Sequence, residues 1–161
     1  MTRFDITYKE NYTKMFSIAK KMVNDKDVAC DIVQDVFVYY YEKLQKGYVV
    51  ECPHNWLLRA TINKCIDHSA ALKNFEQLGN LDSEEEQQED ILEKKQTEMI
   101  VRNALRQLKS QEEIQLVLLY SEGYSYKDIS EITGIKFTSV GKTLSRTLKK
   151  LKEILLKSGI Y

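Results

Sequence analysis

The chain has 161 residues, of which 43% are hydrophobic and 30% charged, with six glycines and one proline. This is enough for one medium-sized domain or two small ones, and so few turn-forming residues argue against a β-sandwich or barrel. The chain has neither an apolar run long enough to cross a membrane nor the apolar start of a signal peptide. Its three cysteines do not form a dense framework, so we expect reduced thiols in a cytoplasmic protein.

The net charge of zero conceals three segments of different charge. Residues 1–75 carry 11 Lys and Arg against 9 Asp and Glu, residues 76–98 carry 2 against 9, and residues 99–161 carry 11 against 6. A basic segment that follows an acidic one is typical of a protein with a polyanionic partner, such as nucleic acid. We therefore expect two domains, 1–75 and 99–161, joined by an acidic linker.

Apolar residues that recur at spacings of three and four predict three helices in the first domain. The first is expected to begin near Tyr8, with Thr7 and Glu10 as a capping box. The second covers about 28–46, and the third begins at Pro53, whose missing N–H does no harm in the first turn of a helix. Short connections between them predict a helical bundle.

The second predicted helix carries a polar patch, formed by Asp31, Gln34 and Asp35, on the side away from its apolar stripe. Side chains three and four residues apart share one helix face, so these three are neighbours. Such a patch can bind a basic partner helix, or it can simply be solvated, as most surface carboxylates are. The residues alone favour the second interpretation.

The third predicted helix combines an aromatic side chain with basic, amide and acidic ones. This combination can stack on unpaired bases and hydrogen-bond them. Trp56 is equally suited to a core, and residue types alone favour that interpretation. The candidate nucleic-acid contacts on this helix are Trp56, Arg59, Asn63, Lys64 and Asp67.

The C-terminal part has the proportions of a helix-turn-helix, whose second helix lies in the major groove of DNA. Ser125 and Asp128 are expected to cap a short helix, Gly134 turns the chain, and a longer helix runs to about Leu156.

On that longer helix an apolar stripe is expected to face inward, so that the basic residues face outward. The stripe consists of Val140, Leu144, Leu148 and Leu151. Small polar side chains suit an approach to base edges, and basic ones neutralise phosphates or reach guanine acceptors. The expected DNA contacts are Lys136, Thr138, Ser139, Lys142, Thr143, Arg146 and Lys149.

The order of these motifs resembles that of the extracytoplasmic-function (ECF) sigma factors, the minimal two-domain group of bacterial sigma factors. The motifs that carry the resemblance are Asp31–Phe37, Pro53–Arg59, Asn63, Asp67–His68, Ala104–Leu108, Glu122–Ile135 and Val140–Leu151. The resemblance implies an all-α protein, with a bundle similar to sigma region 2 and a helix-turn-helix similar to region 4. It also implies a transcription initiation factor without catalytic site or cofactor. Its partners would be core RNA polymerase, promoter DNA and, as is usual in the family, an anti-sigma factor.

By similarity, Asp31, Gln34 and Asp35 would dock on the clamp helices of core polymerase. The segment from Gly47 through Asp67, which includes the contacts named on the third helix, would help melt the upstream edge of the promoter and hold an extruded base of the minus-ten element. The residues from Lys136 to Lys150 would read the minus-thirty-five element in the major groove. The acidic linker would pass toward the RNA exit path.

Several positions depart from the family pattern, and Leu108 with Lys109 replaces the frequent Leu-Pro. After Asp67 the family usually has several arginines, whereas residues 68–73 supply one lysine. Gly141 stands inside the recognition helix where a basic residue is common, and it costs about 1 kcal/mol of helix propensity against alanine. The missing arginines weaken the electrostatic grip expected around the minus-ten DNA.

Other kinds of protein fit less well. Cys52 with His54 and Cys65 with His68 suggest metal ligands, but the two pairs would lie roughly 17 Å apart along one helix, too far for one zinc ion. The chain has no phosphate-binding glycine loop or nucleophile motif, so an enzyme is not expected. A conventional helix-turn-helix regulator that acts without polymerase is the main alternative, and a helical adaptor that binds only proteins is a further one.

Overall fold

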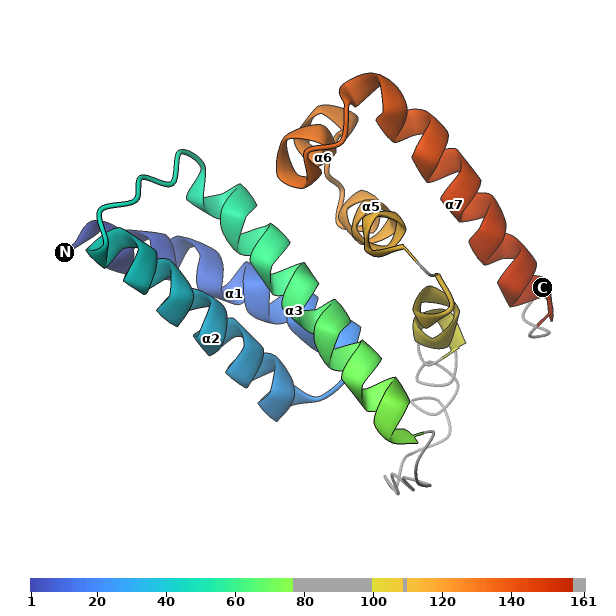
Figure 1. The fold of residues 1–161 in the computed structure, drawn as a ribbon, viewed down its shortest axis with the longest axis horizontal. Coiled ribbons are helices and arrows are strands. Elements are labelled where there is room, and N and C mark those ends of the chain that lie inside the picture. Colours follow the sequence, from blue (N-terminus) through green and yellow to red (C-terminus); the bar gives the residue numbers. More distant parts are fainter. Residues whose placement is uncertain (77–99, 109, 158–161) are drawn as a thin grey trace. The chain divides into compact units, whose positions relative to one another are not determined.

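The computed structural model describes residues 1–76, 100–108 and 110–157, in two compact units, Met1–Leu72 and Lys73–Tyr161. The regular structure of these residues is helical throughout, which confirms the predicted all-α class (Figure 1). The linker expected at 76–98 lies outside the described residues, apart from Glu76 at the end of a helix. The described part of the chain contains no helix with the length and apolar character that a bilayer span requires.

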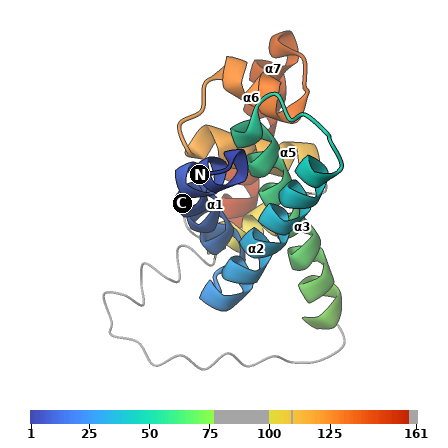
Figure 2. The same ribbon diagram turned by 90° about the vertical axis from the view of Figure 1, so that its left-hand side faces the viewer.

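The first unit is a bundle of three helices that lie side by side in two perpendicular views (Figures 1 and 2). They are α1 (Arg3–Val23), α2 (Lys26–Gln45) and α3 (Pro53–Glu76). Each contributes apolar side chains to one core, because their hydrophobic residues recur at helical spacing. The largest fully buried side chains of this core are Met15, Val33, Val36, Tyr40, Leu57, Leu58 and Ile62.

Helix α1 begins earlier than its apolar pattern indicates. The hydroxyl of Thr2 accepts from the N–H of Asp5, and the Thr2 N–H donates to the Asp5 carboxylate at 3.0 Å, which forms a capping box. The bonds from Thr2 to this carboxylate hold the pKa of Asp5 below its ordinary value. The expected box at Thr7 and Glu10 is therefore wrong, and Thr7 lies buried inside the helix. The helix gains these extra turns because Phe4 packs on α2, with its ring centroid 5.2 Å from that of Tyr41.

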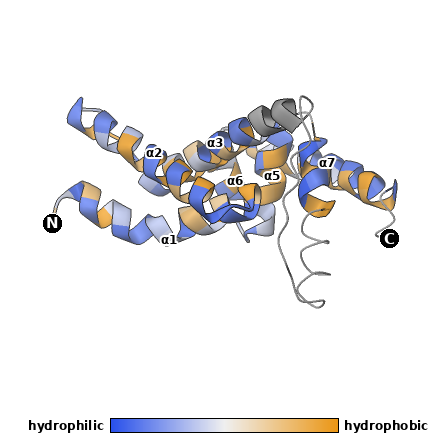
Figure 3. Ribbon diagram, turned by 90° about the horizontal axis from the view of Figure 1, so that it is seen from below, coloured by the Kyte–Doolittle hydropathy of each residue, from blue (hydrophilic) through white to orange (hydrophobic). Residues whose placement is uncertain are grey.

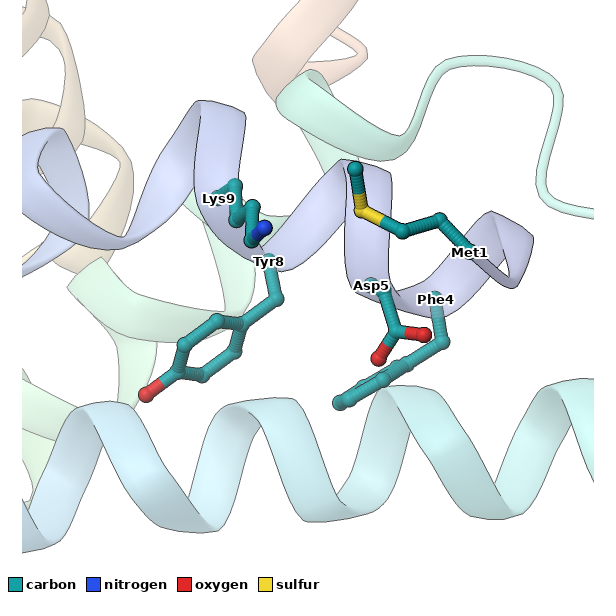
Figure 4. A pocket seen from close by; sticks show the side chains of 5 residues that line it. All are labelled: Met1, Phe4, Asp5, Tyr8 and Lys9. Atoms are coloured by element: carbon teal, nitrogen blue, oxygen red, sulfur yellow. The ribbon is translucent and has the colours of Figure 1, made fainter.

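Aromatic rings line the contact between α1 and α2. Phe4 and Tyr8 point from α1 toward α2 (Figure 4), and the ring of Tyr8 meets Phe37 edge-on with centroids 4.8 Å apart. The series continues to α3, since Tyr40 lies 5.7 Å from Trp56, centroid to centroid. Ring pairs at these separations add to the stability that area burial alone supplies.

The second unit contains α5 (Gln111–Ser121), α6 (Tyr126–Thr133) and α7 (Phe137–Lys157), and residues 100–106 are also helical. Helices α6 and α7 have the predicted arrangement. Ser125 and Asp128 form a capping box, and Gly134 ends α6 in the left-handed conformation, with φ of 81°.

Helix α7 carries hydrophobic and hydrophilic residues on different faces, which Figure 3 shows as alternating colours. One member of its expected stripe is misplaced. Leu148 is 38% exposed, and Thr147 is buried in its stead, with its hydroxyl donating to the Thr143 carbonyl at 2.8 Å. An α-helix has 3.6 residues per turn, so its buried line advances by four and three residues in turn, from Val140 through Leu144 and Thr147 to Leu151.

Candidate polymerase and promoter interfaces

The polar patch on α2 faces solvent as expected. Asp31, Gln34 and Asp35 are all exposed, because the residues between and beside them turn the opposite side of the helix into the core. Gln34 is held locally, since its Nε2 lies 3.6 Å from the Sγ of Cys30 one turn earlier. The patch thus presents two carboxylates and one amide on a rigid, well-packed helix.

The side chains expected on α3 divide between solvent and the bundle. Arg59, Lys64 and Asp67 are exposed, whereas Asn63 and Trp56 are half-buried. The Lys64 ammonium lies 3.9 Å from the Asp35 carboxylate of α2, so the α3 surface adjoins the α2 patch.

Trp56 is both a packing residue and a partly accessible one, so its position fits the core role and the base-stacking role considered from the sequence. Its ring packs against Tyr39 and Tyr40 of α2, with centroids 5.6 and 5.7 Å away, and yet it keeps part of its surface accessible. Tyr40 is fully buried, whereas Tyr39 is 49% exposed. Trp56 therefore anchors α3 to α2 and, with Tyr39, also forms an accessible aromatic surface.

Two residues next to this surface, Lys43 and Tyr48, carry no functional prediction from the sequence. The Lys43 ammonium lies 5.3 Å from the ring centroid of Tyr39 and 4.9 Å from that of Tyr48. Tyr48, in the segment between α2 and α3, is 60% exposed. Helical periodicity does not pair a helix residue with one in the following segment. The signal for this contact is Gly47, because a glycine at this place favours a helix end that brings the side chains of Lys43 and Tyr48 together.

Helix α7 presents its polar side chains as expected. Lys142, Arg146 and Lys149 are exposed on the helix, and Lys136 and Thr138 are exposed at its beginning. The other two expected contacts, Ser139 and Thr143, are half-buried.

One basic residue of α7 has a structural partner. The Lys150 ammonium lies 2.8 Å from a carboxylate oxygen of Glu113 on α5, and the Glu113 side chain is 18% exposed. This pair ties α7 to α5, next to a small apolar cluster that includes Ala104, Leu108 and Leu151. Lys150 is exposed like Lys149 beside it, but its ammonium is engaged by the Glu113 carboxylate.

Gly141 lies at a close approach between α6 and α7. A Cβ atom built at this position would lie 3.4 Å from the Cε2 atom of Tyr126, the first residue of α6. This distance corresponds to ordinary van der Waals contact, so the glycine allows the approach without being strictly required by it.

Two of the residues considered as metal ligands, His54 and Cys65, have other environments in the bundle. The Nδ1 of His54 lies 2.7 Å from the Oδ1 of Asn11, and burial raises the pKa of the Cys65 thiol to about 12. Among the described residues, no group of three or more His, Cys, Asp or Glu side chains is placed to hold a metal ion. The one pocket that Figure 4 draws is lined by residues of the chain start and α1: Met1, Phe4, Asp5, Tyr8 and Lys9.

Comparison with known proteins assigns both units. Residues 7–74 match Sigma-70 region 2, and residues 98–151 match Sigma-70, region 4. The chain is 26% identical over 133 residues to the RNA polymerase sigma factor SigZ of Bacillus subtilis (strain 168), covering 83% of this chain and 76% of that protein. The fold is similar to that of the sigma factor RpoE from Bartonella quintana, solved in complex with the anti-sigma factor NepR. That match has a TM-score of 0.59 at 19% identity and covers 96% of this chain and 98% of the other.

The two matched regions follow each other in the order of a bacterial RNA polymerase sigma factor. The chain belongs to the sigma-70 family, and within it to the extracytoplasmic-function group. It binds core RNA polymerase and promoter DNA and directs transcription initiation, and the alternative of a regulator acting without polymerase is not favoured.

Proposed function

We propose that the two units of this sigma factor divide the work of promoter recognition. Residues 1–75 bind core polymerase and the minus-ten element, residues 99–161 bind the minus-thirty-five element, and residues 76–98 link them. The division into two compact units and the two family matches support this assignment. The observation that carries it is the pair of solvent-facing surfaces, acidic on α2 and basic on α7, each on a helix whose other side is buried.

Core polymerase is bound through Asp31, Gln34 and Asp35. Their side chains are exposed at helical spacing on one face, where they can meet a basic helix of the partner without any change in the bundle. Charge complementarity of this kind chiefly raises the association rate and the specificity of the complex.

The minus-ten element is bound along α3. Arg59 and Lys64 are exposed and can neutralise phosphates, while Asn63 and Asp67 offer hydrogen bonds to an unpaired base. Trp56, backed by Tyr39, supplies an accessible aromatic surface, and stacking on such a ring contributes about 1–3 kcal/mol per base.

The minus-thirty-five element is read in the major groove by α7. The first residues of a recognition helix contact base edges, and here Thr138 and Ser139 occupy that position, with Lys136 just before the helix. Further along the helix, Arg146 and Lys142 can reach guanine acceptors or phosphates, and Thr143 and Lys149 flank them.

These roles require binding surfaces only, so the protein has no catalytic activity of its own and acts in the cytoplasm, where RNA polymerase works. An anti-sigma factor is a further partner. The similar Bartonella quintana sigma factor was solved with one, and a protein that covers the α2 patch would block polymerase binding.

The proposal is tested by transcription in vitro with purified core polymerase on a pool of genomic fragments, with start sites mapped by sequencing. The sigma factor should direct core enzyme to a defined set of starts that share two elements. Specific binding of the free protein to DNA, with no effect of core enzyme, would instead identify a regulator. Absence of any salt-dependent DNA binding, with or without core enzyme, would identify an adaptor.

A further inference from the structure

We propose that Lys43 is a positioning residue for promoter opening, which holds the ring of Tyr48 where it can stack on an unpaired promoter base. The inference rests on the proposed role of the first unit at the minus-ten element. It adds a residue on α2, and one in the following segment, to the side chains assigned there from α3.

The Lys43 ammonium faces two aromatic rings. It lies 5.3 Å from the ring centroid of Tyr39 and 4.9 Å from that of Tyr48, and both distances are within the range of cation–π attraction. Tyr39 in turn packs on Trp56 of α3. Lys43 thus connects the aromatic surface of α2 and α3 to a ring in the segment between them.

The C-terminal end of α2 brings Lys43 and Tyr48 together. The N–H of Tyr48 donates to the Lys43 carbonyl at 3.1 Å, and the N–H of Gly47 donates to the Leu44 carbonyl at 3.1 Å. Gly47 has φ of 87°. These are the two hydrogen bonds of a Schellman motif, in which the side chains at the positions of Lys43 and Tyr48 regularly pack on each other. Lys43 therefore holds Tyr48 through its backbone and through its side chain.

The ring that Lys43 holds remains accessible to a partner. Tyr48 is 60% exposed and its neighbour Val49 is 74% exposed, so neither is needed by the core of the bundle. A large ring that is fixed in position and still accessible is suited to stacking, because its ordering is complete before the base arrives. The segment that follows Tyr48 leads into α3, whose side chains are proposed to hold the same DNA.

The test uses holoenzyme assembled from core polymerase and the full chain, with a fluorescent single-stranded minus-ten probe taken from a promoter mapped as above. In a series of probes, each base is replaced in turn by an abasic site. Wild-type holoenzyme should lose affinity by about 5- to 100-fold at the position that stacks on Tyr48. Tyr48→Leu should lose a similar amount of affinity for the intact probe, and an abasic site at that position should then cause no further loss. Tyr48→Phe, which keeps the ring, should behave as wild type.

Lys43 is tested by Lys43→Met, which keeps the apolar stem, and Lys43→Arg, which keeps the cation. Lys43→Met should weaken binding of the intact probe by about 3- to 10-fold, and Lys43→Arg should recover wild-type binding. Lys46→Met is the matched control, because it removes an equal charge at the same helix end, from an exposed side chain with no ring beside it among the described residues. Affinity for core enzyme should be the same in all variants.

Equal losses from Lys43→Met and Lys46→Met would overturn the proposal, because charge alone would then explain them. Abasic sensitivity that Tyr48→Leu leaves unchanged at every position would also overturn it, and so would a loss of core affinity in Tyr48→Leu, which would place the ring against polymerase. If a thermal melt shows that Lys43→Met unfolds the bundle, the comparison of Tyr48→Leu with Tyr48→Phe decides whether the ring stacks on a base, because Tyr48 is exposed and its substitution leaves the core intact. A wild-type holoenzyme that binds none of the probes would instead contradict the proposed function itself.

Discussion

The Lys64 ammonium on α3 lies 3.9 Å from the Asp35 carboxylate on α2, so an ion pair joins the proposed polymerase patch to the proposed minus-ten surface. Both side chains are well exposed, at 46% and 68%. Such pairs contribute at most about 1 kcal/mol to stability, so this one does not hold the bundle together. Its significance is that the two proposed interfaces are close neighbours in one small unit.

Lys64→Met should therefore separate the two functions. The variant should fold normally and bind core polymerase as wild type does, while the holoenzyme should bind promoter DNA more weakly and with a smaller salt slope, reduced by about one. Fluorescence anisotropy over a salt series measures both quantities. Lys20→Met, which removes an exposed lysine from α1 of the same unit, is the control. A fall in core affinity in Lys64→Met alone would move Lys64 to the polymerase interface.

Reversal of charge at Asp31 and Asp35 should abolish copurification with core polymerase. Both carboxylates face solvent, so Asp31→Lys with Asp35→Lys should leave the helical circular dichroism signal unchanged. Like charges facing the basic partner helix would then repel it. Glu10→Lys on α1 makes the same kind of reversal at an exposed position and should retain binding. If the double variant still copurifies, polymerase docks elsewhere.

Arg146 and Lys150 should differ in what their removal affects. Arg146→Ala should weaken holoenzyme binding to a cognate promoter by about 1–3 kcal/mol if the residue contacts a guanine. Lys150→Ala should lower the unfolding free energy by at most about 1 kcal/mol, through loss of its pair with Glu113, and change DNA affinity little. Filter binding and urea denaturation distinguish the two. Equal loss of DNA affinity in both variants would show that α7 contributes only general charge.

Two glycines of the helix-turn-helix should respond to alanine in opposite ways. Gly141→Ala should raise stability by up to about 1 kcal/mol, because alanine favours a helix and the new Cβ meets Tyr126 at ordinary contact distance. Gly134→Ala should lower it by about 1–2 kcal/mol, because an L-residue is strained at φ of 81°. Thermal melting checks both. A lower melting temperature in Gly141→Ala would contradict this expectation and would show that the Tyr126 ring cannot move to accommodate the new methyl group.

Cys65 should make the first unit less stable at high pH. Burial raises the pKa of its thiol from the ordinary 9.0 to about 12. Above pH ~9 the unfolded thiol ionises while the folded one does not, so the stability of the wild type falls relative to Cys65→Ala, with a slope approaching about 1.4 kcal/mol per pH unit. Urea unfolding of both proteins at several pH values measures this difference. In native protein at pH 8, Cys65 should also resist alkylation, whereas the exposed Cys52 should react.

Local patterns in the sequence were sufficient for most of the secondary structure. The ends of α6 follow from Ser125, Asp128 and Gly134, because a capping box and a left-handed glycine are satisfied by residues within a few positions of each other. The exposed α2 patch follows from helical spacing for the same reason. At the start of α1 the sequence offers two capping residues, Thr2 and Thr7. The helix begins after Thr2, because the added residues let Phe4 pack on α2.

Contacts between distant residues were decided only in the folded chain. The pairing of Lys150 with Glu113, the approach of Tyr126 to Gly141 and the position of Lys43 between Tyr39 and Tyr48 each depend on how helices pack or end. Hydrophobic periodicity states which face of a helix is buried, but it carries no information on which side chains of another element come to lie there. Local patterns along the chain are thus enough for the helices, the exposed charges and the family, whereas the packing of helices decides which of those charges remain available to a partner.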